Sequence, residues 1–276
     1  MTSTDHDLRQ FARLVDALEP WLDRVLFIGG WAHRLFRERP EAARLSYPPL
    51  RTGDVDVALD PRALERDAGI RERLAASGFR EEFLGDDRPP VTHYSLGDEA
   101  SGFYVEFLSP LLGGDRRRDG SWDVTERIAG VTAQKLRYLD ILLVEPWTVT
   151  IGEEQGVPLG RPAELLIPNP ASFVVQKLLI SPGRRREDRA KDALYVHDTI
   201  ELFAADLEAL HAIFLERIAP TLSRSARLAL RRETAAYDEV TDLTREAALI
   251  AGFRGLTPQA IQEVCQAGLR RLIDGG

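Results

Sequence analysis

Cysteine and lysine are both scarce in this sequence of 276 residues. The single cysteine, Cys265, has no partner within the chain, which excludes an intramolecular disulfide and a zinc site built from cysteines. A reducing cytosol is the setting that this predicts. Only three of the 36 basic residues are lysines, at positions 135, 177 and 191. A genome rich in G and C would produce this bias through codon content, which weakens any argument from the number of arginines.

Long apolar runs are absent as well. No stretch approaches the roughly 18 apolar residues that a membrane helix needs, and the polar start at 1–5 lacks the regions of a signal peptide. We therefore expect a cytoplasmic protein with no membrane partner. The net charge of -8 counts against broad, salt-dependent binding of nucleic acid, although it leaves room for a local basic patch.

Several common catalytic motifs are missing. The chain has no Gly-x-x-x-x-Gly-Lys-Ser/Thr loop, no Gly-x-Ser-x-Gly elbow and no His-Glu-x-x-His pair. Its five histidines are widely separated, at positions 6, 33, 93, 197 and 211. Because they show no metal-ligand spacing, we expect them to be surface or core residues rather than ligands. His33, directly after a Gly-Gly turn, is the one that could face a site.

The pattern that is present divides the chain into two halves. Strands are predicted at 24–28, 54–59, 91–96, 103–108, 147–151 and 164–167, with helices at 7–18, 31–37 and 61–77. Segments 38–50 and 111–120 are predicted as loops, and 132–144 fits a helix or a strand. From Pro170 to Ile273 the pattern is helical. The sequence thus predicts an α/β half and an all-helical half that meet near residue 169.

Three features of the first half point toward phosphate chemistry. Gly29-Gly30 ends a predicted strand and begins a helix, so the backbone there can approach a phosphate. Asp54 and Asp56 project from one face of a predicted strand, where Mg²⁺ would relieve their repulsion. Glu106 is a lone acid in an apolar strand and is the natural third ligand. Each feature also has an ordinary explanation, because Gly-Gly turns are common and acids line the wet faces of strands.

In this order the three features resemble the polymerase-beta-like minimal nucleotidyltransferase superfamily. The matching residues are Gly29-Gly30, the run Arg51-Thr52-Gly53-Asp54-Val55-Asp56-Val57, and Val105-Glu106-Phe107. The resemblance implies an α/β (α+β) fold with a small mixed sheet flanked by helices. It also implies a nucleotidyltransferase catalytic domain over residues 1–169 and a helical domain over residues 170–276.

Two branches of the superfamily are similar to different parts of the chain. Gly-Gly-Trp-Ala at 29–32 is similar to the opening of aminoglycoside and lincosamide nucleotidyltransferases. Lys177 followed by Lys191-Asp192 is similar to the abortive-infection toxins, which would imply an antitoxin partner. The chain departs from the superfamily through an apparent insertion at 38–50, and from the toxins through Tyr195, where they carry another acid.

The resemblance assigns a role to each candidate residue. Asp54, Asp56 and Glu106 would hold Mg²⁺ in a two-metal site, and Glu106 would help to remove a proton from the acceptor. Gly29, Gly30 and Trp31 would hold the triphosphate of an NTP donor. The roles of two further residues stay open. Arg51 either contacts phosphate or pairs with an Asp. Lys177 either contacts the triphosphate or is an ordinary lysine whose ammonium group reaches the solvent.

The implied activity is Mg²⁺-dependent transfer of an NMP from an NTP to a hydroxyl acceptor, with release of pyrophosphate. The acceptor is open between an RNA end such as that of tRNA, a protein and a small antibiotic-like molecule. For an RNA acceptor, the run Arg184-Arg185-Arg186 with Arg189 is the expected contact. The alternative is a catalytically silent relative that binds a nucleotide or a partner, which the two departures would favour.

Overall fold

The chain forms two compact units. Residues 3–60, 69–84, 90–97, 102–114, 116, 120 and 123–275 are described by the computed structural model. The first unit comprises Met1–Glu38 and Arg51–Pro168, and the second comprises Arg39–Leu50 and Asn169–Gly276. The segment predicted as an insertion therefore belongs almost entirely to the second unit. The later division falls one residue before the predicted boundary at 169.

One mixed sheet forms the framework of the first unit. Its nine strands are β1 (Val25–Ile28), β2 (Asp54–Leu59), β3 (Arg80–Leu84), β4 (Val91–Ser95), β5 (Tyr104–Pro110), β6 (Thr125–Ile128), β7 (Val131–Leu136), β8 (Trp147–Ile151) and β9 (Ala163–Ile167). The order is β3-β4-β5-β2-β1-β9-β8, with β7 on the far end of β5 and β6 beside β7. Three pairs are parallel, β2 with β5, β5 with β7 and β1 with β9, which confirms the predicted mixed sheet.

Some segments differ from the sequence-based expectation. The ambiguous segment 132–144 contains most of β7 and the short helix α5 (Leu139–Leu142). Strands β3 and β6 were not predicted; β3 is mostly exposed, so its sequence Arg-Glu-Glu-Phe-Leu lacks the alternation of a half-buried strand. The predicted helix 61–77 appears as α4 (Ile70–Ala76), and its residues 61–68 lie outside the described part of the chain.

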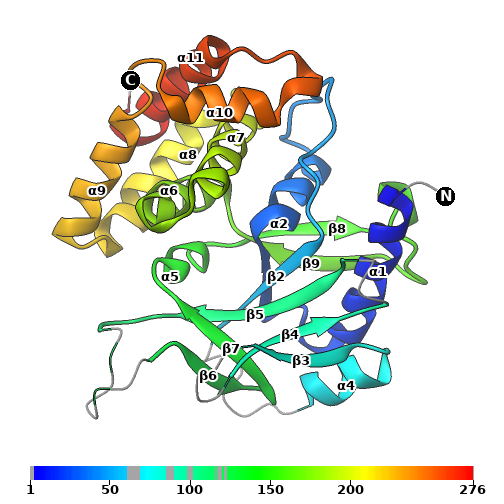
Figure 1. The fold of residues 1–276 in the computed structure, drawn as a ribbon. Coiled ribbons are helices and arrows are strands. Elements are labelled where there is room, and N and C mark those ends of the chain that lie inside the picture. Colours follow the sequence, from blue (N-terminus) through cyan, green and yellow to red (C-terminus); the bar gives the residue numbers. More distant parts are fainter. Residues whose placement is uncertain are drawn as a thin grey trace. The chain divides into compact units, whose positions relative to one another are not determined.

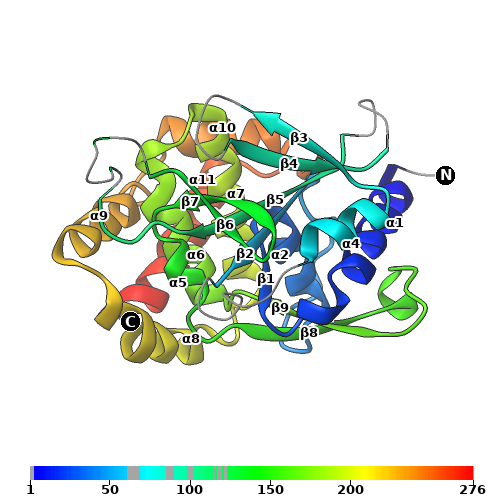
Figure 2. The same ribbon diagram turned by 90° about the horizontal axis from the view of Figure 1, so that it is seen from below.

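Helices α1 (Ser3–Ala17) and α2 (Gly29–Leu35) lie on one face of the sheet (Figure 1). Aromatic side chains pack them against it. Phe11 of α1 stacks on Trp31 of α2 with ring centroids 3.9 Å apart, and its edge meets Phe27 of β1 at 5.4 Å. Val57 of β2 lies opposite Phe27 and is fully buried on the same face. Both views show α1 beside α4 (Figure 2). This face is therefore a closed apolar layer.

The opposite face of the sheet is apolar at one end and polar at the other. Leu26, Ala58 and Leu108 are buried there under Leu139 and Leu142 of α5. Two residues before Ala58 and Leu108 on their strands, the same face carries Asp56 and Glu106. Helix α5 thus covers only the end of the sheet away from the carboxylates.

The second unit is a set of helices around α7. The helices are α6 (Pro170–Ile180), α7 (Arg186–Leu202), α8 (Leu207–Ile213), the π-helix η5 (Phe214–Ile218), α9 (Arg224–Ala235), α10 (Asp242–Ile250), α11 (Pro258–Leu269) and the π-helix η8 (Arg270–Asp274). Helix α7 packs against α6, α10 and α11 and is buried over most of its length. Charged residues on α7 therefore need partners inside the protein.

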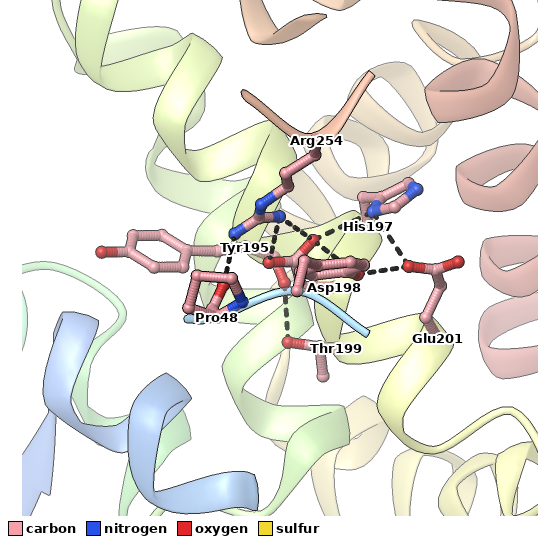
Figure 3. Close-up of polar contacts among 8 residues, drawn as sticks. Pro48, Tyr195, His197, Asp198, Thr199, Glu201 and Arg254 are labelled. Atoms are coloured by element: carbon pink, nitrogen blue, oxygen red, sulfur yellow. Dashed lines mark hydrogen bonds and ion pairs between the residues drawn. The ribbon is translucent and has the colours of Figure 1, made fainter. Parts of the chain in front are cut away.

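Asp198 of α7 is fully buried and anchors the 39–50 segment within the second unit (Figure 3). Arg254 donates from Nη1 to both oxygens of Asp198, at 2.9 and 2.8 Å, and from Nη2 to the carbonyl oxygen of Pro48 at 3.1 Å. The guanidinium lies 4.1 Å from the ring centroid of Tyr47. The Tyr47 hydroxyl is within hydrogen-bond distance of Asp198 and Glu201. One buried ion pair thus fixes a segment more than 140 residues earlier in the chain.

Replacing Arg254 by Met should destabilise the protein by about 3–5 kcal/mol, because the charge of Asp198 would stay buried without its ion-pair partner. The measurement is the free energy of unfolding by urea titration. The matched control is Arg245→Met, since Arg245 and its partner Asp242 are both largely exposed and such pairs contribute about 0–1 kcal/mol. Equal losses of unfolding free energy in the two variants would show that the buried Asp198–Arg254 pair contributes no more to stability than the exposed pair.

Candidate functional site

Three carboxylates lie on one face of two neighbouring strands. Asp54 and Asp56 are two residues apart on β2, so their side chains project from the same face. Strand β5 runs parallel to β2, with Glu106 opposite Asp56 and Tyr104 opposite Asp54. Because neighbouring strands lie about 4.8 Å apart, the two opposed carboxylates are adjacent. All three acids are half-buried. Their side chains are therefore restrained by neighbouring residues and are still accessible to solvent.

The negative charges of the three acids all act on Tyr104, which lies on the same face. Burial raises the pKa of Tyr104 first, and the negative charges of Asp54, Glu106 and Asp56 raise it further, to about 12. The phenol therefore stays neutral, with its proton, at physiological pH. Carboxylates gathered in this way repel one another unless a positive charge lies among them.

The donor set fits Mg²⁺. Carboxylate oxygens are the hard ligands that this ion prefers, and the three acids come from two adjacent strands on a rigid sheet. Asp54 is oriented by the hydroxyl of Thr52, which donates to its Oδ1 atom. The residues present can thus hold a divalent cation through Asp54, Asp56 and Glu106.

Gly29 is required by its close approach to Asp56. It has a φ of +62°, in the left-handed region that favours glycine, and a Cβ placed on it would overlap the Asp56 carboxylate. Gly30 follows in the first turn of α2 and is buried. The predicted Gly-Gly turn therefore lies directly beside the carboxylates, as a phosphate-holding turn would need to.

Trp31 and Arg51 have mainly structural contacts. The Trp31 side chain is buried between Phe11 and Phe103, so only its backbone could meet a ligand at the start of α2. Arg51 is largely exposed and pairs through Nε with Asp7 of α1 at 3.3 Å. Of the two roles open for Arg51, the structure shows pairing with an Asp, although with one on α1 rather than on β2.

Lys177 lies in the second unit and is paired. Its Nζ atom is 2.8 Å from Oδ1 of Asp192, both side chains are buried, and the ammonium lies 5.1 Å from the ring centroid of Tyr195. Arg184 reaches the other oxygen of Asp192 at 3.1 Å. Contact of Lys177 with a triphosphate stays a prediction. Tyr195, which replaces the expected acid, covers the lysine with its ring.

Each arginine of the run in the second unit is paired with an acid. Besides the Arg184 pair with Asp192, Arg185 pairs with Asp188, Arg186 with Glu246, and Arg189 with Glu233. Each of these arginines therefore has a carboxylate beside it. The predicted contact with an RNA acceptor stays a prediction, and its positive charge is weaker than the sequence alone suggests.

A second group of potential metal ligands lies on α7. Ligand atoms of His197, Asp198 and Glu201 lie within 4.8 Å of one another. Both oxygens of Asp198, however, already accept from the buried guanidinium of Arg254 (Figure 3). The hydroxyl of Tyr47 contacts both acids. A cation already balances this group, so we assign it a structural role.

His93 is a site neighbour that the sequence did not reveal. It lies on β4 directly opposite Glu106, and its Nε2 atom is 2.5 Å from Oε1 of that residue. The sequence-based expectation was an ordinary surface or core histidine. The His93–Glu106 pair follows from the register of β4 against β5. The spacing of residues along the sequence does not give this register.

Within the described residues, no helix combines the length and apolar character needed to cross a membrane.

None of the curated proteins matches the sequence. Among solved structures, the crystal structure of an antigenic nucleotidyltransferase-like protein from Paracoccidioides brasiliensis matches at 16% identity, covering 86% of this chain and 92% of that chain with a TM-score of 0.41.

A family model described as a nucleotidyltransferase matches residues 6–218. The match includes the Gly29-Gly30 turn, all three carboxylates and α7 of the second unit. It covers well over half of the 276 residues, and the chain therefore belongs to this family of nucleotidyltransferases.

Proposed function

We propose that this chain is a Mg²⁺-dependent nucleotidyltransferase that transfers an NMP from an NTP to a hydroxyl acceptor and releases pyrophosphate. One observation carries the proposal: Asp56 and Glu106 are directly opposed on parallel strands, with Asp54 on the same face and Gly29 against Asp56. Membership of the family supports nucleotidyl transfer in general. The metal, the donor and the acceptor are parts of the proposal.

Asp54, Asp56 and Glu106 would hold two Mg²⁺ ions. When bound, the metal would neutralise charge on the phosphates and polarise a phosphoryl oxygen as a Lewis acid. The left-handed turn at Gly29, followed by Gly30 and the Trp31 backbone, would bind the triphosphate through its amides. The half-buried position of the acids keeps them organised without excluding a substrate.

The chemical step is a displacement at the α-phosphorus of the NTP. The acceptor oxygen forms a bond to this phosphorus while the bond to the oxygen that bridges to the β-phosphate breaks, and pyrophosphate leaves. Glu106 takes up the proton of the acceptor hydroxyl. Tyr104 lies on the same face of β5 as Glu106 and keeps its proton at physiological pH, so it can donate a hydrogen bond in the same place.

The acceptor hydroxyl belongs to one of three classes: an RNA end such as that of tRNA, a protein side chain, or a small antibiotic-like molecule. Incubation of labelled NTPs and Mg²⁺ with a pool of each class tests the proposal. Label transfer to one pool, with release of pyrophosphate, is the expected result. NTP binding that is indifferent to Mg²⁺, with no transfer to any pool, would instead identify a silent nucleotide-binding relative.

Asp56→Asn should lower pyrophosphate release by at least about 100-fold, because loss of a ligand charge removes several kcal/mol of transition-state stabilisation. Steady-state assays would measure it, and thermal unfolding would check the fold. Glu164→Gln is the matched control, since Glu164 is an exposed acid on β9 of the same sheet. An Asp56→Asn variant as active as the control would refute the assigned site.

Gly29→Ala should abolish transfer, because the added methyl group would displace the Asp56 carboxylate and strain the left-handed backbone. Gly113→Ala is the control for backbone strain: Gly113 also has a positive φ, of +86°, but a Cβ there meets nothing within 4 Å. Both variants should lose about 1–2 kcal/mol of stability. Only Gly29→Ala should lose Mg²⁺-dependent binding of NTP by calorimetry, and similar binding in the two variants would contradict the close approach.

A further inference from the structure

We propose that His93 is a positioning residue that fixes the orientation of Glu106. By holding Oε1, the imidazole would leave Oε2 for a metal ion and for the acceptor proton. The inference rests on the proposed function for the role of Glu106. The pairing itself is a feature of the structure.

The register of the sheet places His93 within a line of acidic residues. Across the strands, Glu82, His93, Glu106 and Asp56 are opposed in turn, so their side chains share one face. The imidazole stands between the carboxylates of β3 and β5. Its Nε2 atom lies 2.5 Å from Oε1 of Glu106, and both side chains are about one-fifth exposed.

The imidazole is itself held in place. Its ring stacks on the Tyr104 ring, with centroids 4.7 Å apart and planes 9° from parallel. Tyr104 lies on the same face of β5 as Glu106, two residues before it. A ring fixed by a strand backbone and by a stacked neighbour presents its Nε2 atom to Glu106 in a defined direction.

An unpartnered glutamate has three rotatable side-chain bonds and would sample several orientations beside Asp56. Ordering such a side chain costs up to about 2 kcal/mol. Residues that hydrogen-bond to metal ligands lessen this cost, and their loss typically lowers metal affinity or activity by about 10–100-fold. His93 therefore supports the carboxylate that has to reach both a metal and a substrate.

Two variants of His93 separate the contact of its Nε2 atom with Glu106 from the ring. His93→Phe keeps a ring that can stack on Tyr104 but removes the nitrogen atom, and His93→Gln keeps a polar nitrogen near the Nε2 position but removes the ring. His6→Phe is the matched control, since His6 lies on α1 and contacts Gln10. Thermal unfolding would verify that each variant is folded.

The first measurement is Mn²⁺ binding in the presence of a non-hydrolysable NTP analogue, followed by electron paramagnetic resonance of the free ion. We expect His93→Phe to weaken binding of at least one Mn²⁺ by about 10-fold or more, His93→Gln to retain most of the affinity, and His6→Phe to match the wild type. In the transfer assay, kcat should fall in His93→Phe while the KM for NTP changes little, and His93→Gln should restore part of kcat.

The outcomes distinguish this inference from the proposed function. Wild-type protein that binds no Mn²⁺ with the analogue would overturn both. Wild-type protein that binds Mn²⁺, with a folded His93→Phe variant of equal affinity and equal kcat, would overturn only the role of His93. Equal losses in His93→Phe and His93→Gln would show that the polar contact with Glu106 does not position this carboxylate, and would also overturn the inference.

Discussion

The register of β2 against β5 is the constraint on which the site depends. It brings Asp54, Asp56 and Glu106 together although their charges repel. Alternate residues of the same strands are fully buried on the other face, among them Val55, Val57 and Val105. A slip of one residue would exchange the two faces, burying the acids and exposing the valines. The hydrophobic layer thus holds the carboxylates in an arrangement that they would not adopt alone.

The other parts of the first unit follow from this two-sided strand pair. Helices α1 and α2 cover the apolar face, with Phe11 and Trp31 stacked between them. Helix α5 covers only the end of the polar face where Ala58 and Leu108 lie. The acids are therefore left half-buried beside the Gly29 turn. A half-buried group of carboxylates suits a bound cation, because the ligands are held in place and a charged substrate can still reach them.

The strand pattern around Asp54 and Asp56 could be predicted from the sequence, because alternation along a strand is a local property. The mixed α/β fold was likewise predicted correctly. Contacts between distant segments that depend on tertiary packing were not predicted: Arg51 meets Asp7, and Tyr47 meets Asp198. The position of His93 opposite Glu106 was not predicted either, since it depends on strand register. The catalytic roles of the site residues remain predictions that rest on chemistry and on the family.

The most direct test is the position of a bound metal. Crystals grown with Mn²⁺ and a non-hydrolysable NTP analogue would locate the ion by its anomalous scattering. We expect the anomalous signal among the carboxylates of Asp54, Asp56 and Glu106, with the triphosphate beside Gly29. A signal at His197 and Glu201, or none near β2 and β5 while the nucleotide is bound, would contradict it.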